Sequence, residues 1–538
     1  DTLALIPTKL SQFGKMFELK TKKEILPYEM YNNENIKQRY LPIDKCLSYI
    51  KNTDDHEEFL QNCEDWGCYH CDRTHIDIIK YSIEYCKMDC VVLRDGYDKF
   101  RALIMEATGL DSQYYLTLPS IASDYLKKEG CFDGCYSLAG IPRDFIADSA
   151  WGGRVMTKNN EKQIVVFRQD HSKTITDLDE VSQYPSSMAR MEGFVKGCPK
   201  IITEWKNDGM DYDMFYVRIE IIAVVKRLNF PLLNERGKGS VNWTNNMVGK
   251  RMTVDKYSLM DLLFFHKIQY KFINGYYFDE GFNPTINETI RKLFYSRFQA
   301  KNQIKKIGGD DTSIRKIPLD DIKTAMGGSV DFDEWIKEQY DSETEEIYKN
   351  PLQEVYKLLM NSAYGKMLLK PIDTSLHYVR KGKLRHHYNK FHHQIKCMEA
   401  SANGCYAKIT HYEPIDTHFN EVHIGANVLS IAKRMMMEVM TIGEELDMSP
   451  EYTDTDSIQI IEQYVEPIKD EYNSRFGKYG NDYYVLPEML GEDLGQFNLD
   501  IDIKGCRDVV SRYAIWLGKK CYIHKLEGIN KKTNQPQV

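Results

Sequence analysis

The sequence lacks long apolar runs and lacks a positive net charge. No uninterrupted apolar stretch approaches the ~18–20 residues that a membrane-spanning helix needs, so no such helix is predicted. Asp and Glu (79) outnumber Lys and Arg (71), which gives a formal net charge of −8. Phosphate binding requires local positive charge, but a basic cleft can lie inside an acidic shell, so the net charge excludes no anionic partner. The acidic excess is concentrated between Gly308 and Glu346.

A second Cys-x-x-Cys pair is also missing. Thirteen cysteines in a chain of this length are typical of a reduced intracellular compartment rather than of a disulfide scaffold. The densest group is Cys63, Cys68 and Cys71, close to His70 and His75. Zinc uses such ligands, but the usual ligand set is not completed, so a loop of free thiols is favoured over a zinc site.

At 538 residues the chain is too long for one ordinary hydrophobic core, and several domains should share it. Residues 1–130 are predicted to form helices and loops, without a strong series of strands. Apolar spacing predicts helices at 82–101, 287–306, 350–367 and 424–446. Strands are predicted at 163–167, 174–178 and 215–225, with a hairpin at 452–461 and an irregular basic segment at 369–419. There are no convincing internal repeats, and the expected fold class is mixed α/β.

The predicted hairpin carries two carboxylates. Asp454 and Asp456 are separated by one residue at a tight turn, and apolar β-forming residues flank them. Such a pair is costly unless a positive partner neutralises it. Mg²⁺ is such a partner, because it prefers hard oxygen ligands, usually one or two carboxylates together with substrate phosphates. A solvated Asp-rich turn is the alternative interpretation.

A further carboxylate lies far upstream. A β-forming run enters at Ile175 and a turn follows before Pro185, so Asp179 is expected at a strand end, within reach of the later hairpin. Two such carboxylates could hold two metal ions ~3.5–4 Å apart, an arrangement that stabilises the attacking and leaving oxygens in phosphoryl transfer. Asp177 is the rival ligand in this segment, and an ordinary strand edge with surface acids is the alternative interpretation.

The helix predicted at 350–367 has recognisable ends. Asn350 suits the N-cap, Pro351 the first helical position, and Gln353 a capping box, while Gly365 suits the end. Lys357, Asn361 and Tyr364 then fall on one face. A cation, an amide and an aromatic ring on one face suit a nucleotide. The preceding helix adds a basic stripe, which is either a triphosphate contact or a solvated face: Arg297, Lys301 and Lys305.

Three motifs resemble those of a known family. Asp179-x-x-Ser-x-Tyr-Pro, Lys357-x-x-x-Asn-Ser-x-Tyr-Gly and Tyr452-x-Asp-Thr-Asp-Ser are similar to motifs A, B and C of family B DNA polymerases, and they occur in that order. The closer resemblance is to the protein-primed branch found in phages, adenoviruses, organellar linear plasmids and related elements. The resemblance implies a right-hand polymerase with an antiparallel palm sheet, helical fingers and a partial RNase H-like 3′–5′ exonuclease domain.

Four further stretches resemble the protein-primed branch. One is Phe419 to Met440, including Asn427, Lys433 and Arg434, which is similar to the segment leading into motif C. Trp151-Gly152-Gly153-Arg154 resembles its Tyr-x-Gly-Gly linker, although Ala150 stands where the Tyr would be. Lys520-Cys521-Tyr522 resembles the Lys-x-Tyr that steadies the primer terminus. The spacing of Tyr85 and Asp89 resembles the third exonuclease motif. For Lys520 and Tyr522 the alternative is a charge at a strand end and a packed ring.

The resemblance implies roles for individual residues. Asp179 and Asp456 would bind two Mg²⁺ ions, with Mn²⁺ as a substitute, assisted by the Glu180 carbonyl, and Asp454 would support the site. Tyr184 would act as the steric gate against a ribose 2′-hydroxyl. Nucleotide contacts are implied for Tyr184, Lys357, Asn361, Tyr364, Arg297 and Lys301. Contacts with DNA or primer are implied for Trp151, Gly152, Gly153, Ser182, Ser362, Gly365, Thr455, Ser457, Lys520 and Tyr522.

The resemblance also implies a domain order. The expected segments are 1–130 (C-terminal part of the exonuclease domain), 131–192 (linker and palm), 193–287 (first insertion, contacting a terminal protein), 288–368 (fingers, with an acidic insertion at 308–349), 369–420 (second insertion, strand displacement), 421–528 (palm) and 529–538 (start of the thumb). The first two exonuclease motifs and most of the thumb are not found, so the chain is expected to be a fragment.

The expected activity is DNA-directed DNA polymerisation, with primer–template DNA, deoxynucleoside triphosphates and a terminal protein as partners, and 3′–5′ exonuclease activity in the intact protein. The expected location is intracellular, without distinction between nucleus, cytoplasmic viral factory, mitochondrion and phage-infected cell. A nuclease with a vestigial polymerase site and a non-catalytic replication scaffold are the rival hypotheses. The intact motifs A, B and C argue against the nuclease, and the presence of Asp179, Asp456 and Lys357 together argues against the scaffold, which needs no paired-metal site.

Overall fold

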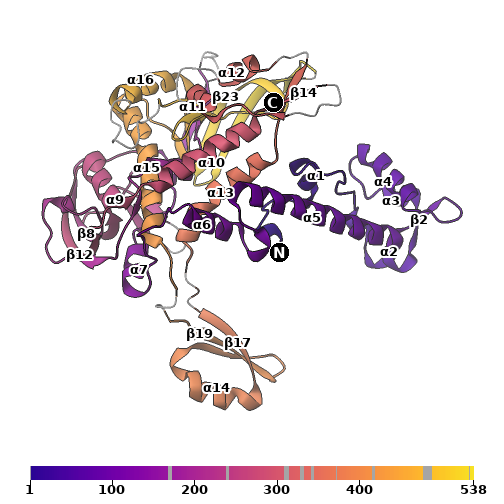
Figure 1. Cartoon of the computed structure of the whole chain (residues 1–538), viewed down its shortest axis with the longest axis horizontal. Coiled ribbons are helices and arrows are strands. Elements are labelled where there is room, and N and C mark those ends of the chain that lie inside the picture. Colours follow the sequence, from indigo (N-terminus) through magenta and orange to yellow (C-terminus); the bar gives the residue numbers. More distant parts are fainter. Residues whose placement is uncertain are drawn as a thin grey trace. The chain divides into compact units, whose positions relative to one another are not determined.

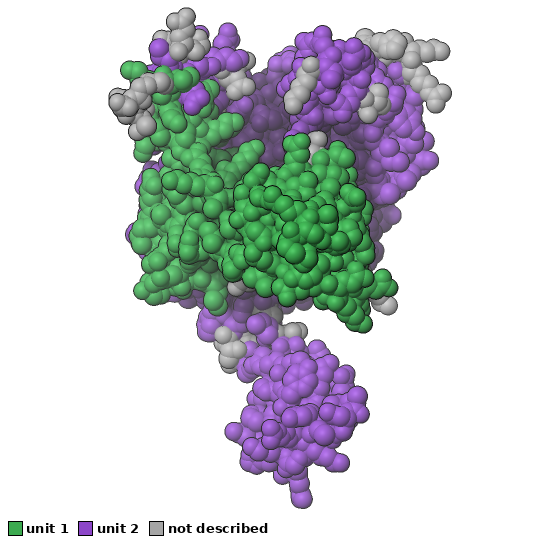
Figure 2. Space-filling view, turned by 90° about the vertical axis from the view of Figure 1, so that its right-hand side faces the viewer, with its two compact units in different colours: residues 1–121, 297–316, 347–359 green, residues 122–296, 317–346, 360–538 purple. Residues whose placement is uncertain are grey.

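The computed structural model describes residues 2–167, 173–237, 241–307, 314–326, 332–340, 344–370, 372, 374–414, 418–476, 488–531 and 533–537. The chain divides into two compact units, which Figure 2 colours separately. Unit 1 comprises residues 1–121, 297–316 and 347–359, and unit 2 comprises residues 122–296, 317–346 and 360–538. Within the described ranges, no helix is long and apolar enough to cross a membrane.

The helices have the following bounds: α1 Phe13–Met16, α2 Asn33–Gln38, α3 Ile43–Leu47, α4 Asp54–Asp65, α5 Ile78–Thr108, α6 Leu118–Lys128, α7 Gly140–Ala147, α8 Gln183–Arg190, α9 Lys256–Asp261, α10 Thr285–Lys301, α11 Leu319–Met326, α12 Phe332–Glu338, α13 Leu352–Met367, α14 Leu384–Phe391, α15 Val422–Glu445 and α16 Val465–Phe476.

The strands are β1 Tyr40–Pro42, β2 His75–Asp77, β3 Val155–Thr157, β4 Gln163–Val166, β5 Ile175–Glu180, β6 Phe194–Val195, β7 Lys200–Ile201, β8 Met214–Val224, β9 Asn234–Arg236, β10 Val241–Trp243, β11 Arg251–Asp255, β12 Ile268–Phe278, β13 Phe282–Asn283, β14 Gln303–Lys306, β15 Ile314–Arg315, β16 Glu345–Tyr348, β17 Thr374–Arg380, β18 Ile395–Ala400, β19 Tyr406–Tyr412, β20 Tyr452–Asp454, β21 Ser457–Ile461, β22 Phe497–Leu499, β23 Cys506–Gly518, β24 Cys521–Asn530 and β25 Pro536–Gln537.

Unit 1 contains the long helix α5. Its start is capped by Asp77, whose side chain accepts the backbone N–H of Lys80, and Gly109 ends it in the left-handed conformation at φ 66°. Cys63 and Cys68 lie buried in the apolar core of this unit, whereas Cys71 is exposed. Burial raises the pKa of the Cys68 thiol to about 11, so this side chain behaves as a small apolar group.

Unit 2 is organised around a nine-stranded sheet. Its main strand order is β25-β24-β23-β5-β21-β20-β3, with β22 paired to β5 and β4 to β23. The central strands carry Leu178, Ile458 and Ile460 on a fully buried face, which packs with Met436 and Met440 of α15 in one core cluster. Alternation along β5 and β21 therefore buries one face of β5, which bears Asp179, and of β21, which directly follows Asp456.

A smaller sheet in unit 2 has the order β11-β8-β12-β7. It belongs to the segment predicted as the first insertion. Strand β8 pairs with β11 and β12, and its alternating apolar side chains form a second core cluster. The predicted strand at 215–225 is thus present with nearly the expected bounds.

The helix predicted at 287–306 ends early. α10 ends at Lys301, and Gln303–Lys306 forms β14, in which Ile304 pairs with Arg315. Lys305 therefore lies on a strand and not on the predicted basic stripe of the helix, and that part of the prediction is wrong. The β-branched Ile304 is buried and strand-paired, so tertiary packing decides the local structure here.

The ends of α13 also differ in detail from the prediction. Asn350 caps the helix as expected, because its Oδ1 accepts the Leu352 backbone N–H at 2.9 Å. The side chain of Gln353 donates to Glu354 instead of closing a capping box. Gly365 lies inside the helix, which continues to Met367. Gly365 is therefore not the terminating glycine.

The segment predicted to be irregular, 369–419, is largely ordered. β17, β19 and β18 form a three-stranded antiparallel sheet, and α14 lies beside it, as Figure 1 shows. His387 of α14 and His411 of β19 meet through their Nε2 atoms at 2.9 Å, and Phe391 packs against both rings. On β19 the buried positions are Ala407, Ile409 and His411, so only two of the three are apolar, and the apolar periodicity of this segment is weak.

The predicted acidic insertion, 308–349, is described only in part. Its Gly-Gly-Asp-Asp start and Gly327-Gly328 lie outside the described residues. The described part contains the short helices α11 and α12, with β15 before them and β16 after them along the chain.

Candidate active site

The structure brings Asp179 and Asp456 together. β5 and β21 are adjacent antiparallel strands, and Ser457 is the register partner of Asp179. Asp456 directly precedes Ser457, and its backbone oxygen accepts the N–H of Glu180 at 2.8 Å. Two carboxylate residues from distant parts of the sequence, one on β5 and one in the turn before β21, thus lie at the same end of the sheet.

The two carboxylates lie among further negative charges. The pKa of Asp179 is raised to about 7, first by burial and then by the charges of Asp456, Asp500 and Asp177. The pKa of Asp456 is also raised, mainly by burial and further by Asp454. Asp500, which follows β22, was not predicted from the sequence. Neighbouring acids that destabilise one another's charged forms suit a site that receives a cation.

Asp177, the rival ligand, lies two residues before Asp179 on the same strand, with its side chain toward the same face. Its carboxylate accepts the Gln459 Nε2–H at 3.0 Å, and burial raises its pKa to about 6. Gln459 in turn accepts from Trp516 Nε1. Asp177 is therefore part of a buried hydrogen-bond network, in which its carboxylate has a neutral partner.

The carboxylate of Asp454, two residues before Asp456, is held by the side chains of Lys520 and Tyr452. This carboxylate accepts two hydrogen bonds from Lys520 Nζ, at 2.8 and 3.0 Å, and one from the Tyr452 hydroxyl at 3.1 Å. The Tyr522 ring lies 5.2 Å from the Tyr452 ring. The predicted Lys-x-Tyr segment thus lies beside the carboxylate turn, with Lys520 71 % exposed.

The Gly-Gly linker packs against the same turn. The backbone N–H of Thr455 donates to the Arg154 carbonyl at 2.8 Å. A Cβ placed on Gly153 would lie 2.3 Å from Thr455 Cγ2, whereas nothing lies within 4 Å of a Cβ on Gly152. Trp151 is fixed from the other side, because its carbonyl accepts from the buried Lys433 at 2.8 Å. Gly153 is therefore required by close approach to the turn.

Two of the predicted nucleotide-binding aromatic residues meet. The rings of Tyr184 and Tyr364 stack with centroids 3.9 Å apart and an interplanar angle of 27°. Tyr184 is on α8, which begins after Ser182, a residue with φ 50°. Along α13, Asn361 and Gly365 are exposed and Ser362 is half-buried.

The predicted phosphate-binding cations lie in unit 1. Lys357 is exposed on the first half of α13. Near the end of α10, the Arg297 guanidinium lies 5.7 Å and Lys301 Nζ 5.4 Å from the Phe298 ring centroid. All three remain predictions as triphosphate contacts.

The exonuclease-type residues Tyr85 and Asp89 lie one turn apart on α5, also in unit 1. Lys23 donates to Asp89 at 2.9 and 3.1 Å and contacts the Tyr85 hydroxyl. Tyr28 adds a second hydroxyl 3.3 Å from that of Tyr85. Lys23 was missed from the sequence, because nothing in its local pattern distinguishes it from Lys20 or Lys22.

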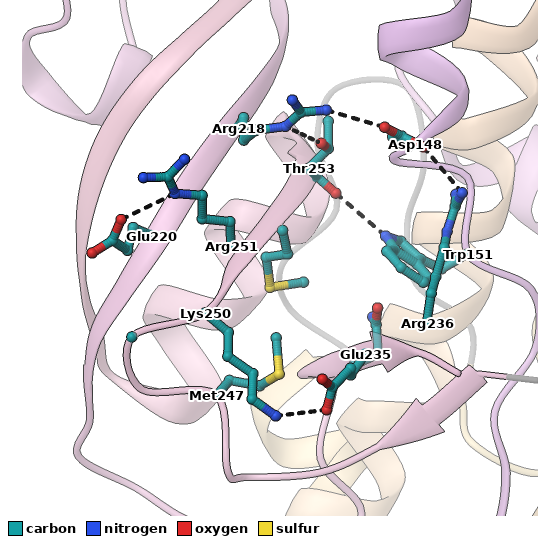
Figure 3. Close-up of a pocket in the computed structure, with 13 residues that line it drawn as sticks. Asp148, Trp151, Arg218, Glu220, Glu235, Arg236, Met247, Lys250, Arg251 and Thr253 are labelled. Carbon is teal, nitrogen blue, oxygen red and sulfur yellow. Dashed lines mark hydrogen bonds and ion pairs between the residues drawn. The ribbon is translucent and has the colours of Figure 1, made fainter. Parts of the chain in front are cut away.

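A pocket of ≈ 760 Å³ lies elsewhere in unit 2, and neither Asp179 nor Asp456 lines it. Figure 3 shows its wall, formed by β8, β11 and the linker, with Trp151 near Arg236. Its charged side chains pair with one another: Arg218 and Arg236 with Asp148, Lys250 with Glu235, and Arg251 with Glu220. The sequence did not predict this pocket.

The comparisons with known proteins all find DNA polymerases. The sequence model of the family described as DNA polymerase type B, organellar and viral, matches residues 1–312. A probable DNA polymerase of Ascobolus immersus is 23% identical over 197 residues, which cover 36% of this chain and 15% of that protein. The chain thus spans a small part of the length of this relative.

Solved structures of Phi29 DNA polymerase share the fold. One form in complex with primer–template DNA has a TM-score of 0.53 at 14% identity, and the match covers 100% of this chain and 70% of that one. An orthorhombic crystal form has a TM-score of 0.54, also at 14% identity, with 69% of that chain covered. The mixed α/β architecture with its antiparallel sheets is consistent with the right-hand polymerase fold expected from the sequence.

Proposed function

Because this chain belongs to the family of type B DNA polymerases of organellar and viral origin, we propose that it is the catalytic part of a DNA-directed DNA polymerase. It extends a primer by joining the primer 3′-hydroxyl oxygen to the α-phosphorus of a deoxynucleoside triphosphate. The hydroxyl loses its proton, and the bond from that phosphorus to pyrophosphate breaks.

One observation carries the proposal. Asp179 is on β5, and Asp456 is in the turn that leads into the adjacent strand β21; Ser457 lies opposite Asp179, and the Glu180 backbone N–H donates to the Asp456 carbonyl at 2.8 Å. A scaffold has no need of such a pair, because the pKa values of both carboxyl groups are raised, that of Asp179 by burial and by the charge of Asp456, and that of Asp456 by burial and by Asp454. The pair is therefore the feature that separates the catalytic function from the scaffold alternative.

The donor set fits the divalent metal that the family uses. Hard carboxylate oxygens are the ligands that Mg²⁺ prefers, and the charges of Asp456, Asp500 and Asp177 all raise the pKa of Asp179. Asp179 and Asp456 would hold the metal, assisted by the Glu180 carbonyl. Bound Mg²⁺, with Mn²⁺ as substitute, supplies Lewis-acid stabilisation of the attacking and leaving oxygens.

Further side chains are assigned to the binding and orientation of the substrates. Tyr184 and Tyr364 line the sugar and base of the incoming nucleotide, and the Tyr184 ring occupies the space that a 2′-hydroxyl would need. Lys357, helped by Arg297 and Lys301, neutralises charge on the triphosphate. Lys520, held by Asp454, and Tyr522 steady the primer terminus. Further contacts with DNA are proposed for Trp151, Gly152, Gly153, Ser182, Ser362, Gly365, Thr455 and Ser457.

Primer extension tests the proposal. A labelled primer–template is incubated with Mg²⁺ and either deoxy- or ribonucleotides, using the wild type, Asp456→Ala and Asp470→Ala, which removes an exposed acid from α16. Extension with deoxynucleotides that is lost only in Asp456→Ala supports the proposal. Extension that survives Asp456→Ala means that the metal site is elsewhere, and a folded wild type that binds DNA without extending it favours the scaffold.

Protein priming is the finer part of the proposal. In the first round, a Ser, Thr or Tyr hydroxyl of a terminal protein would replace the primer 3′-hydroxyl. Residues 193–287 would contact that protein, and 369–420 would guide the displaced strand. In the second segment, Tyr378 and Tyr388 are 67% and 50% exposed among lysines and arginines, the mixture that strand tracking uses. Deletion of 374–412 that leaves strand displacement unchanged would contradict this role.

A 3′–5′ exonuclease in the intact protein is the second candidate function. Tyr85 and Asp89 on α5, joined by Lys23, are the observation that favours it. The intact protein should shorten labelled single-stranded DNA from its 3′ end, and Asp89→Ala should abolish this while leaving primer extension in place. Equal degradation by the variant would assign the nuclease to other residues.

A further inference from the structure

The side chain of Gln183 lies between the two segments that carry the carboxylates. Gln183 is the first residue of α8 and is only 5% exposed. Its Nε2 donates to Glu180 Oε2 at 3.1 Å and to the Thr455 carbonyl at 3.0 Å. Glu180 directly follows Asp179, and Thr455 directly precedes Asp456. One side-chain amide therefore ties together both segments.

The turn at Thr455 depends on contacts from outside the hairpin. Thr455 has φ 67°, a left-handed conformation that a β-branched residue adopts only when its surroundings impose it. Its backbone N–H is held by the Arg154 carbonyl at 2.8 Å, and its side chain fills the space beside Gly153. Its carbonyl is held by Gln183. The Arg154 carbonyl thus binds the backbone N–H of Thr455, and the Gln183 amide binds the backbone carbonyl of Thr455.

We propose that Gln183 is a positioning residue that keeps Asp456 in register with Asp179 for binding of the divalent metal. This inference rests on the proposed function, and it assigns Gln183 no contact with metal, nucleotide or DNA. Without its amide, the Thr455 carbonyl loses its partner and the strained turn relaxes. Asp456 then shifts relative to Asp179, whereas the stacked rings of Tyr184 and Tyr364 make no contact with the Thr455 carbonyl through Gln183.

Gln183→Met is the informative variant. Met is unbranched and close to Gln in length, so it fills the space and removes only the two donated hydrogen bonds. Asn245→Leu is the matched control, because Asn245 makes two hydrogen bonds with the backbone of Leu228, at 2.9 and 3.2 Å. Those bonds lie in the segment 193–287, which contains neither Asp179 nor Asp456. Both variants lose two hydrogen bonds of an amide, but only one loses them at the turn.

Metal binding is measured first, without DNA or catalysis. Mn²⁺ is titrated into the full chain and the free ion is followed by electron paramagnetic resonance. Gln183→Met is expected to bind Mn²⁺ about tenfold more weakly than the wild type, the size of effect that two modest hydrogen bonds support. Asn245→Leu is expected to keep the wild-type affinity.

The catalytic readout follows the same variants in primer extension. For Gln183→Met, the half-saturating Mg²⁺ concentration should rise about tenfold and kcat should fall, while KM for nucleotide and for primer–template changes little. If Gln183→Met does not fold, Gln183→Asn replaces it. Asn keeps the polar group but is one methylene too short to reach both acceptors.

The outcomes separate the inference from the proposed function. Mn²⁺ affinity and Mg²⁺ half-saturation equal to those of the wild type overturn the positioning role, even if primer extension works. Lower thermal stability with unchanged metal affinity also overturns it, because the role is then structural. Weaker Mn²⁺ binding by Gln183→Met, in a protein whose wild type extends no primer, supports the positioning role and rejects the polymerase.

Discussion

The Tyr184 ring stacks on the Tyr364 ring, with centroids 3.9 Å apart. The first residue comes from α8, just after the strand that carries Asp179, and the second from α13, in the motif that also contains Asn361. The sequence predicted both tyrosines as nucleotide contacts, but it could not show that they touch. Their stacking means that one ring supports the position of the other.

The stack predicts a change in sugar selectivity. Replacing Tyr184 with Val removes the ring that would exclude a ribose 2′-hydroxyl, so preference for deoxynucleotides should fall about tenfold to a hundredfold. The ratio of kcat/KM for each deoxynucleotide and its ribonucleotide measures this. Tyr364→Phe, which keeps the stacked ring, should retain the wild-type ratio. An unchanged ratio in Tyr184→Val would assign the gate to another side chain.

The linker predicts a second effect, at Gly153. Gly153→Ala should lower the free energy of unfolding by about 1–3 kcal/mol, because the added Cβ meets Thr455 Cγ2 at 2.3 Å. It should also weaken primer extension, since Thr455 directly precedes Asp456. Urea denaturation and extension assays measure the two effects.

Gly152→Ala is the matched control for Gly153→Ala, because nothing lies within 4 Å of a Cβ at that position. It should be nearly neutral in both assays. Thr455→Gly in the Gly153→Ala background should recover stability, because it removes the clashing side chain. Equal effects at Gly152 and Gly153 would contradict the close approach.

The contact between Lys520 and Asp454 predicts coupling in primer binding. Asp454 fixes Lys520 Nζ at 2.8 and 3.0 Å, so Asp454→Asn and Lys520→Met should each raise KM for primer–template. The double variant should be little worse than either single variant, with an interaction free energy of about 0.5–1 kcal/mol. Additive effects would mean that the two side chains act independently on the primer.

The local parts of the site were predictable from sequence. The hairpin around Asp454 and Asp456, the strand before Asp179 and the helix at 424–446 all appear with bounds close to those expected. Each depends on short-range signals, namely β-forming runs next to a turn or helical apolar spacing. Chemistry-bearing residues within such elements could therefore be named before the structure.

The parts that depend on distant contacts were not predictable. Gln183 is an unremarked position in its motif, and its importance comes from reaching the Thr455 carbonyl, 272 residues away in sequence. Asp500 and Lys23 likewise acquire their roles only through pairing across the fold. The sheet at 374–412 was missed because its apolar alternation is short: Ala407 and Ile409 are buried on β19, the next buried position is His411, and β17 and β18 have no buried residues.

The buried side chain of His423 predicts that unit 2 becomes less stable at acidic pH. His423 is fully buried on α15, its ring stacks on Phe278, and neither ring nitrogen has a hydrogen-bond partner among the described atoms. Burial lowers its pKa to about 3. Since the unfolded pKa is ~6.5, the unfolded state binds more protons below that pH, and stability falls as the pH decreases. The loss from this group is about 2 kcal/mol between pH 7 and pH 5.

His423→Leu tests this directly, because an apolar side chain of similar size leaves no polar partner unpaired. Urea denaturation at pH 7 and pH 5 should give the variant a smaller loss of unfolding free energy than the wild type, by about 2 kcal/mol. His386→Leu, which replaces an exposed imidazole on α14, should keep the wild-type difference between the two pH values. A wild-type pH dependence in His423→Leu would mean that other groups, such as His266, whose pKa burial lowers to about 4, account for the acid sensitivity.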